Sequence, residues 1–261
     1  MIEAKKKFGQ NFLKDGNVLT KIIQAMPQNE RKLVEIGPGL GDLTQELLKV
    51  KSLVAYEVDE DLCVYLRKKF SKEIDEGKLT LVHTDVLDVF TKGSLLNEPY
   101  DLVANLPYYI ATTIILDALD DPYCHTIEVM IQKEVAERIN AEPDCKEYGA
   151  LSVLVQYYCN TSIIRKVPPT CFIPRPKVES IVIKLDRLEE PRVQPKDTKL
   201  MFELVRAGFN MRRKTLWNAA KTLKVNKERL QEAFEKAGID PKRRAETLSL
   251  EEFAALSDCM Y

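Results

Sequence analysis

A glycine-rich segment and two carboxylates at the ends of successive apolar runs form the first set of residues that suggests chemistry. Residues 34–41 read Val-Glu-Ile-Gly-Pro-Gly-Leu-Gly, an apolar run that ends in a turn rich in glycine. Glu57 ends the next run, twenty residues after Gly37, and Asp85 follows the third. Bare backbone N–H groups at such a turn bind ligands, and a carboxylate after the next strand accepts hydrogen bonds from ribose hydroxyls. The glycine-rich turn, Glu57 and Asp85, at the ends of successive strands, predict a site for an adenosine group, with Asp85 available to the adenine amine.

The spacing of the glycines bears on which adenosine compound binds. A dinucleotide site requires Gly-x-Gly-x-x-Gly, whereas here the third glycine comes one position early and Pro38 separates the first two. The pattern fits S-adenosylmethionine better, since that ligand has no pyrophosphate. A ligand-free tight turn is the alternative for the loop alone, and Glu57 and Asp85 weigh against it.

The tetrapeptide Asn105-Leu106-Pro107-Tyr108 follows the fourth apolar run, where open α/β sheets place their reactive groups. An adenine amine is a poor nucleophile, so an enzyme must present acceptors to its hydrogens. The Asn105 side-chain oxygen and the Leu106 carbonyl suit this task, because Pro107 biases the preceding residue toward an extended conformation. Tyr108 offers a ring for a base to stack on. We therefore expect methyl transfer to an adenine amine, helped by neutral acceptors and in-line positioning; an ordinary turn is the alternative.

Neither histidine nor metal chemistry is expected. His83 and His125, the two histidines, lie in or beside apolar runs, where structural roles predominate. The six cysteines include no Cys-x-x-Cys pair, so the sequence favours reduced thiols over a zinc site or a disulfide framework.

The elements that must position these residues alternate between strands and helices. Such alternation is typical of βαβ units and a parallel sheet, and thus of an α/β fold. The last two strands, joined by a rigid proline-rich connector at 168–176, are expected to form a hairpin at the sheet edge. The expected strands are 32–36, 53–57, 79–83, 101–104, 125–132, 162–167 and 178–185, and the expected helices are 42–50, 60–72, 112–119, 133–139 and 150–159.

After residue 188 the pattern changes to a linker and then to mostly helical sequence. We expect two domains, residues 1–188 as the ligand-binding α/β domain and residues 189–261 as a small helical domain. Helices are expected at 197–209, 212–223, 227–237 and 250–257.

Composition favours a cytoplasmic protein of ordinary charge. The 261 residues are 45% hydrophobic, and no run approaches the roughly 20 apolar residues of a membrane span. The net charge is −1, yet the region from Arg187 onward has 16 Lys and Arg against 12 Asp and Glu. Local basic clusters occur at residues 5–7 and 212–214, and each could equally be a solvated surface.

Several separated motifs together resemble the ribosomal RNA adenine dimethyltransferases of the small-subunit type, over nearly the whole chain. The segment Lys7-Phe8-Gly9-Gln10-Asn11-Phe12-Leu13 is similar to the family's N-terminal signature, and the resemblance implies that Asn11 and Leu13 contact the cofactor. Residues 35–39 and 105–108 resemble its remaining motifs. The family's fold is a class I S-adenosylmethionine methyltransferase, a Rossmann-like seven-stranded sheet with a C-terminal all-helical domain. The cofactor-binding residues that the resemblance implies are Asn11, Leu13, Gly37, Glu57, Asp85 and Asn105.

Two further segments resemble parts of the family that handle RNA. Residues 172–178, Phe-Ile-Pro-Arg-Pro-Lys-Val, are similar to a family segment whose phenylalanine closes over the target base, a role that would fall to Phe172; core packing is the alternative. The basic residues Arg212, Arg213 and Lys214 match a helical-domain motif that would contact RNA phosphates and so position the enzyme.

The resemblance implies a substrate and a partner. Two adjacent adenosines in a hairpin loop near the 3' end of 16S rRNA would each be dimethylated at N6 in the assembling 30S subunit, and each base would be flipped out of its stack. The sequence leaves the oligomeric state open, and we expect a monomer because no strong apolar helical stripe requires a partner. The alternatives are a large-subunit (23S) enzyme of the resistance type, against which Leu106 argues modestly, and a non-catalytic assembly factor. Tyr109 departs from the family, where asparagine is frequent in bacteria, and affects only our expectation of substrate handling.

Overall fold

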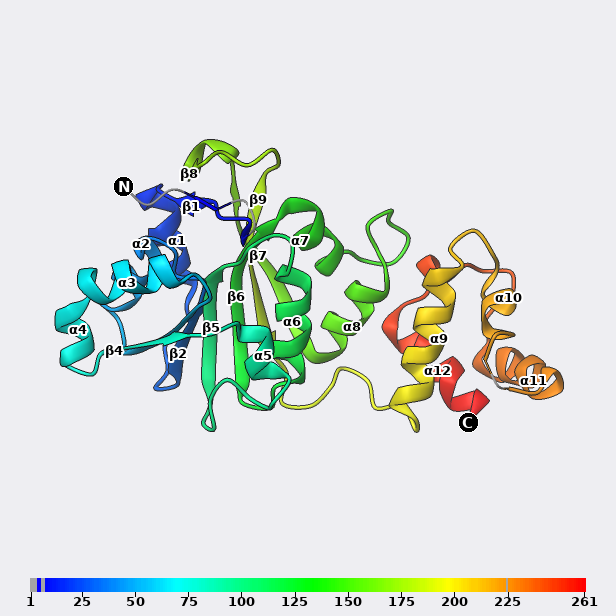
Figure 1. Ribbon diagram of the computed structural model, residues 1–261. Helices are drawn as coiled ribbons and strands as arrows, with labels where there is room; N and C mark the ends of the chain where they lie inside the picture. The colour runs from blue at the N-terminus through cyan, green and yellow to red at the C-terminus, as the bar shows by residue number, and fades with distance from the viewer. Residues whose placement is uncertain (1–3, 6–7, 224) are drawn as a thin grey trace. The chain divides into compact units, whose positions relative to one another are not determined.

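The computed structural model describes residues 4–5, 8–223 and 225–261, which form two compact units (Figure 1). The first consists of Met1–Ala136 and Ser162–Arg187, and the second of Glu137–Thr161 and Leu188–Tyr261. Residues 137–161 thus pack with the helical unit, although they precede the boundary near residue 188 that the sequence pattern suggests. Local pattern does not reveal this grouping, because it depends on which apolar faces meet.

The first unit is built on a seven-stranded sheet, as expected, in the order β4-β3-β2-β5-β6-β9-β7 (Figure 1). Neighbouring strands from β4 to β6 are parallel, and β9 is antiparallel to β6. The expected edge hairpin is present, since β9 and β7 are neighbours and β7 lies at the edge. The strands are β2 (Lys32–Ile36), β3 (Leu53–Glu57), β4 (Leu79–His83), β5 (Tyr100–Asn105), β6 (Cys124–Gln132), β7 (Cys159–Val167) and β9 (Ser180–Arg187).

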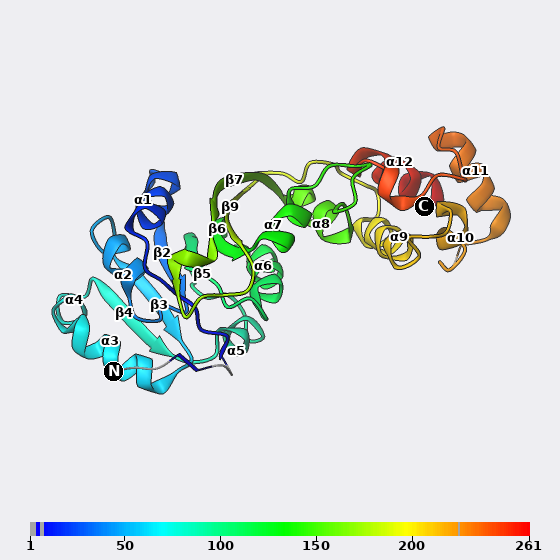
Figure 2. The same ribbon diagram turned by 90° about the horizontal axis from the view of Figure 1, so that it is seen from above.

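Helices cover the sheet (Figure 2), whose parallel strands have their carboxyl ends at one common edge. Residues of α1, α2 and α3 share one apolar core with one face of the sheet. The expected helix at 60–72 is divided at Phe70, where α3 ends and α4 begins. The helices of this unit are α1 (Gly16–Ala25), α2 (Asp42–Leu47), α3 (Glu60–Lys69), α4 (Ser71–Asp75), α5 (Val86–Phe90), α6 (Ala111–Asp120) and α7 (Lys133–Ile139), whose last residues belong to the second unit.

A two-residue strand pair, which the sequence analysis did not expect, joins distant parts of the first unit. Strand β1 (Phe12–Leu13) pairs antiparallel with β8 (Phe172–Ile173), with Leu13 opposite Phe172. The N-terminal segment is thereby fixed to the proline-rich connector.

The second unit is a helical bundle with its own core. Its helices are α8 (Ala150–Tyr158), α9 (Thr198–Asn210), α10 (Leu216–Ala220), α11 (Lys227–Ala237) and α12 (Leu250–Met260). The helix expected at 212–223 was predicted too long, because the Thr215 side chain caps α10 by accepting a hydrogen bond from Asn218 N. Residues 211–214 consequently form a turn. None of the helices in the described part of the chain has the length and apolar character that a membrane crossing requires.

Candidate active site

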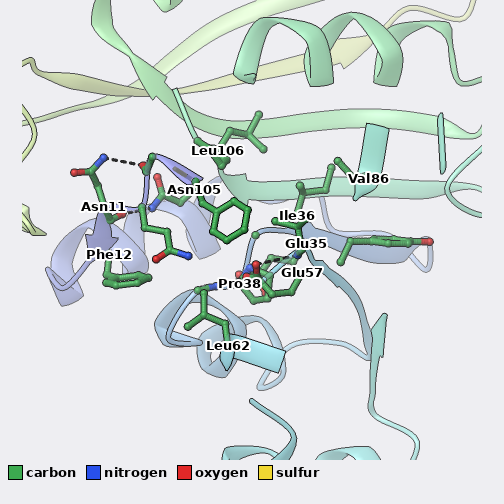
Figure 3. A pocket seen from close by; sticks show the side chains of 18 of the residues that line it. Asn11, Phe12, Glu35, Ile36, Pro38, Glu57, Leu62, Val86, Asn105 and Leu106 are labelled. Carbon is green, nitrogen blue, oxygen red and sulfur yellow. Dashed lines mark hydrogen bonds between the residues drawn. The ribbon is translucent and has the colours of Figure 1, made fainter. Parts of the chain in front are cut away.

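A cavity lies where the carboxyl ends of β2, β3 and β5 meet the N-terminal segment (Figure 3). Its walls come from five stretches far apart in sequence, residues 8–13, 35–40, 56–58, 84–86 and 105–110, with Asp42, Leu43 and Leu62. All the cofactor-binding residues expected from the sequence line it, as do all four residues of the tetrapeptide 105–108. Parallel strands bring these segments together because their carboxyl ends share one sheet edge.

The glycine loop forms a wall of bare backbone. Gly39 and Gly41 have positive φ angles of +59° and +77°, a region that disfavours side chains. A Cβ atom on Gly41 would lie 2.5 Å from the Phe70 ring, and one on Gly39 would lie 3.0 Å from the Phe12 ring. The loop is therefore packed too closely on both sides to accept larger residues.

Glu57 is the most strongly fixed carboxylate of the cavity. Its side chain is buried and accepts hydrogen bonds from Gly39 N at 3.2 Å, Val58 N at 3.0 Å and Asp59 N at 2.9 Å. Burial raises the pKa of Glu57 above its ordinary value, and the three N–H donors oppose that shift. A ligand that donates hydroxyl hydrogens to this carboxylate would further stabilise its charged form.

Asp85 lies at the exposed side of the cavity. Its Oδ1 atom accepts a hydrogen bond from Leu87 N at 3.0 Å and so caps α5. One carboxylate oxygen thus fixes the side chain, and Oδ2 is left for a ligand.

Glu35 also lines the cavity, although the sequence analysis gave it no role of its own. It is 1% exposed and accepts a hydrogen bond from Thr44 Oγ1 at 2.7 Å. Burial raises its pKa to about 8. Its place in the motif before Gly37 was the only available signal, because a strand position alone does not reveal how deeply a carboxyl group is buried.

Asn105 joins the tetrapeptide to the N-terminal segment. Its Nδ2 donates to the Asn11 carbonyl at 3.0 Å, and Asn11 Nδ2 donates to Gly9 O at 3.1 Å (Figure 3). None of the described residues donates a hydrogen bond to Asn105 Oδ1. The amide is thus oriented by its nitrogen, and its oxygen is available as an acceptor.

Tyr108 is held by a hydrogen bond to the sheet. Its hydroxyl group lies 2.6 Å from Ser180 Oγ, on β9. Burial raises the pKa of Tyr108, so the phenol is neutral at physiological pH. Leu106, which is 1% exposed, is fixed through its N–H group to Met130 O at 3.2 Å.

The N-terminal segment is tied across the cavity by charged and polar contacts. Lys5 Nζ lies 2.6 Å from Asp59 Oδ1 and 2.6 Å from Asp61 Oδ2, and Gln10 Nε2 donates to Asp59 Oδ2 at 3.0 Å. Leu13 is buried in the core below. Lys7, the first residue of the expected signature, and Lys6 lie outside the described residues.

Phe172 is not among the residues that line the cavity. Its ring is 3% exposed and packs in the core of the first unit with Leu13, its partner across the β1–β8 pair. The structure thus has this ring in the core-packing position, and closure over a target base stays a prediction.

The basic cluster in the second unit contains two different kinds of residue. Arg212 donates to Lys146 O at 2.9 Å and Tyr148 O at 3.2 Å, and it lies 3.5 Å from Glu246. Arg213 and Lys214 are exposed, and neither forms an ion pair within the described part of the chain. Arg212 is thus bound within this unit, whereas Arg213 and Lys214 are exposed, and the RNA contacts of all three stay a prediction.

Comparisons with known proteins identify the family of this chain. Ribosomal RNA small subunit methyltransferase A of Clostridium botulinum (strain Loch Maree) is 57% identical over 98% of this chain and 94% of that protein, and the same enzyme of Clostridium perfringens (strain 13) is 57% identical over 98% and 90%. Two solved structures are similar to this chain. A dimethyladenosine transferase from Plasmodium falciparum is 25% identical, with a TM-score of 0.80 over 94% of this chain and 95% of that chain. The 23S rRNA methyltransferase ErmE is 25% identical, with a TM-score of 0.74 over 96% of this chain and 99% of that chain. A family model described as ribosomal RNA adenine dimethylase matches residues 1–260, and the chain belongs to this family.

Proposed function

We propose that this chain dimethylates N6 of two adjacent adenosines in a hairpin loop near the 3' end of 16S rRNA, with S-adenosylmethionine as the methyl donor. The observation that carries the proposal is the Asn105 amide, whose nitrogen is bound to Asn11 O and whose oxygen is open at the adenosyl-type cavity. The 57% identity to small-subunit methyltransferases, against 25% to a 23S enzyme, favours the small-subunit substrate.

The cavity residues fit S-adenosylmethionine. Glu57 would hold the ribose hydroxyls by accepting their hydrogen bonds, and Asp85 would accept a hydrogen bond from the adenine amine. The three N–H donors to Glu57 favour its charged form, and a carboxylate there attracts a cation such as a sulfonium more than an anion. Burial instead raises the pKa of Glu35 to about 8, so this group adds little charge to the cavity at neutral pH. The positive φ of Gly39 and the packing of Gly41 keep the backbone free for a close ligand.

The residues of the chain activate the amine by positioning it. When bound, the cofactor supplies an electrophilic methyl group on a sulfonium. Asn105 Oδ1 and the Leu106 carbonyl accept hydrogen bonds from the amine hydrogens, which lets the nitrogen become pyramidal and stabilises the positive charge that develops there. Tyr108, fixed by Ser180, offers its ring face to the flipped base. The orientation of these groups lowers the barrier chiefly by proximity.

The partner is rRNA, and the finer setting is part of the proposal. Arg213 and Lys214 in the helical part, residues 189–261, contact phosphates and position the enzyme on the 30S subunit during its assembly. We place the reaction in the cytoplasm, where ribosomal subunits are built, and expect a monomer to perform it.

The decisive experiment incubates the chain with methyl-labelled S-adenosylmethionine and undermethylated small subunits, followed by identification of the labelled nucleoside. Dimethyladenosine in 16S rRNA supports the proposal. Label only on 23S rRNA would indicate the resistance-type reaction, and cofactor binding without any label would indicate an assembly factor.

The variant that tests the mechanism is Asn105→Ala, for which we expect a loss of kcat of roughly 100-fold or more, the scale seen when one preorganised polar group is removed. Asn105→Asp keeps an acceptor but removes the donor to Asn11 O, and it should also be nearly inactive. Asn97→Ala, an exposed change in the same unit, is the control. Full activity of Asn105→Ala would refute the mechanism.

A further inference from the structure

The helical unit contains a recess of about 540 Å³ that no part of the methylation site uses. Its lining residues belong to α10, α11 and the turn that follows α11. Its volume falls within the roughly 300–1,000 Å³ of pockets that hold small molecules. All of its lining residues belong to the second unit.

The floor and one wall of the recess are aromatic and apolar. Phe234 and Ile239 are buried, and Trp217 is half-buried. The indole ring of Trp217 makes an edge contact with the Phe234 ring, with centroids 5.7 Å apart. The backbone N–H group of Trp217 donates a hydrogen bond to Pro241 O at 3.2 Å. Lys221 Nζ lies 5.1 Å from the indole centroid. The recess therefore presents a fixed, partly exposed ring of the kind on which a base stacks.

The rim of the recess carries groups that can bind the edge of a base. Glu235 and Asp240 line it with exposed carboxylates, which accept hydrogen bonds from exocyclic amines, and Lys242 adds one exposed cation to the same lining. Asp240 Oδ1 is engaged with Lys242 N at 2.9 Å, which fixes that side chain. A planar, neutral group that donates hydrogens suits both the ring and the rim.

The cations that would hold phosphates lie immediately outside. Lys214 precedes Thr215, a wall residue, so their Cα atoms are about 3.8 Å apart. Lys214 and Arg213 are exposed and form no ion pairs with described residues, whereas Arg212 is bound to backbone carbonyls. An aromatic recess with carboxylates on its rim, beside the exposed cations Arg213, Lys214 and Lys242, matches one nucleotide of a single strand, with the base inside and the phosphates outside.

We propose that the Trp217 recess binds one unstacked base of single-stranded RNA that carries an exocyclic amine, with Arg213 and Lys214 holding the adjoining phosphates. The inference rests on rRNA being the partner and adds a second contact point, in the helical unit, to the proposed function. Reading a base there gives the enzyme a means to recognise its RNA apart from the adenosine that is methylated.

The single tryptophan of the chain makes the test direct, because its emission reports on this recess alone. The full chain is titrated with short single-stranded oligomers of adenosine, cytidine or uridine. Stacking on the indole should quench the emission, more strongly for adenosine and cytidine than for uridine, which lacks the amine. Replacing Trp217 by Leu should weaken the binding of labelled oligoadenosine roughly ten-fold or more, and Trp217→Phe should retain part of it.

The double variant Arg213→Ala/Lys214→Ala tests the phosphate contacts. It should reduce the slope of log affinity against log salt by about 0.7 for each phosphate that the protein no longer neutralises. The matched control is Lys199→Ala/Arg206→Ala, which removes one exposed lysine and one exposed arginine from α9. Equal salt slopes for the two double variants would show that Arg213 and Lys214 do not hold the phosphates, which overturns that part of the inference.

Methyl transfer by the same preparation separates this inference from the proposed function. Methylated rRNA without quenching of Trp217 by any oligomer would overturn the recess inference and leave the function standing. Quenching of Trp217 without methyl transfer would support the recess inference and count against the proposed function. If intact subunits shield Trp217 from acrylamide but free RNA has no effect, a ribosomal protein covers the recess and the inference is wrong.

Discussion

Glu128 is a buried carboxyl group whose replacement should change the stability of this protein in a pH-dependent way. It lies on β6, is 1% exposed, and both carboxyl oxygens are buried without a hydrogen-bond partner among the described residues. Lys184, its register partner on β9, instead lies 3.3 Å from Asp186. Burial raises the pKa of Glu128 from 4.5 to about 8.

The sign of the pH effect follows from that direction. The folded chain keeps Glu128 protonated up to about pH 8, whereas the unfolded chain releases the proton above about pH 4.5. The unfolded state is therefore stabilised relative to the folded state as pH rises between these values, at about 1.4 kcal/mol per pH unit. By pH 7 this destabilises the fold by about 3 kcal/mol, an upper estimate because the site can relax.

Glu128→Gln keeps the shape of the side chain and replaces the titratable carboxyl group by a neutral amide. We expect the variant to have a higher free energy of unfolding at pH 7.5, by roughly 1–3 kcal/mol, since its amide also lacks partners. The gain should shrink toward zero near pH 4.5.

Urea denaturation followed by circular dichroism across pH 4.5–8 measures both quantities, and an unchanged dependence on urea identifies a change in stability alone. The control Glu98→Gln, at an exposed position of the same unit, should show no gain. If Glu128→Gln and the wild type keep the same difference in stability at every pH, the carboxyl group is not neutral in the fold and the reasoning is wrong.

Four further substitutions test the site and its supports. Glu57→Gln should weaken binding of S-adenosylhomocysteine roughly 10- to 100-fold by calorimetry, because the ribose hydroxyls lose a charged acceptor. Phe172→Leu should lower the free energy of unfolding by about 1 kcal/mol; a fall in kcat beyond ten-fold in the folded variant would show that the ring also reaches the base. Arg212→Ala should cost about 1–2 kcal/mol of stability because two backbone carbonyls lose a charged donor, whereas Arg213→Ala should change stability by less than about 0.5 kcal/mol, both by thermal unfolding.

The sequence predicted the central sheet well because its strands are short apolar runs bounded by polar residues. Strands β2, β3 and β4 begin and end at the expected residues. The β1–β8 pair was missed because two residues cannot show a period. The start of α10 was missed because Thr215 acts as its cap inside a run that is otherwise compatible with a helix.

The positions of the site residues were predictable where a strand end determines them. Glu57, Asp85 and Asn105 all line the cavity, since each follows or ends a parallel strand. Burial was not predictable in the same way. Glu128 and Phe172 lie in positions whose depth depends on the packing of distant elements, and Arg212 differs from Arg213 only in what it meets in the folded unit.

Asn105 explains why an amide, and not a carboxylate, suits this position. The two ends of the side chain have opposite tasks: Nδ2 must donate to Asn11 O, and Oδ1 must accept from the target amine. A carboxylate has no donor for Asn11 O, so it would leave the N-terminal segment without this hydrogen bond and place negative charge against a carbonyl. The same hydrogen bond that orients the acceptor thus holds the wall of the cofactor cavity, and we expect cofactor binding and amine activation to fail together when it is removed.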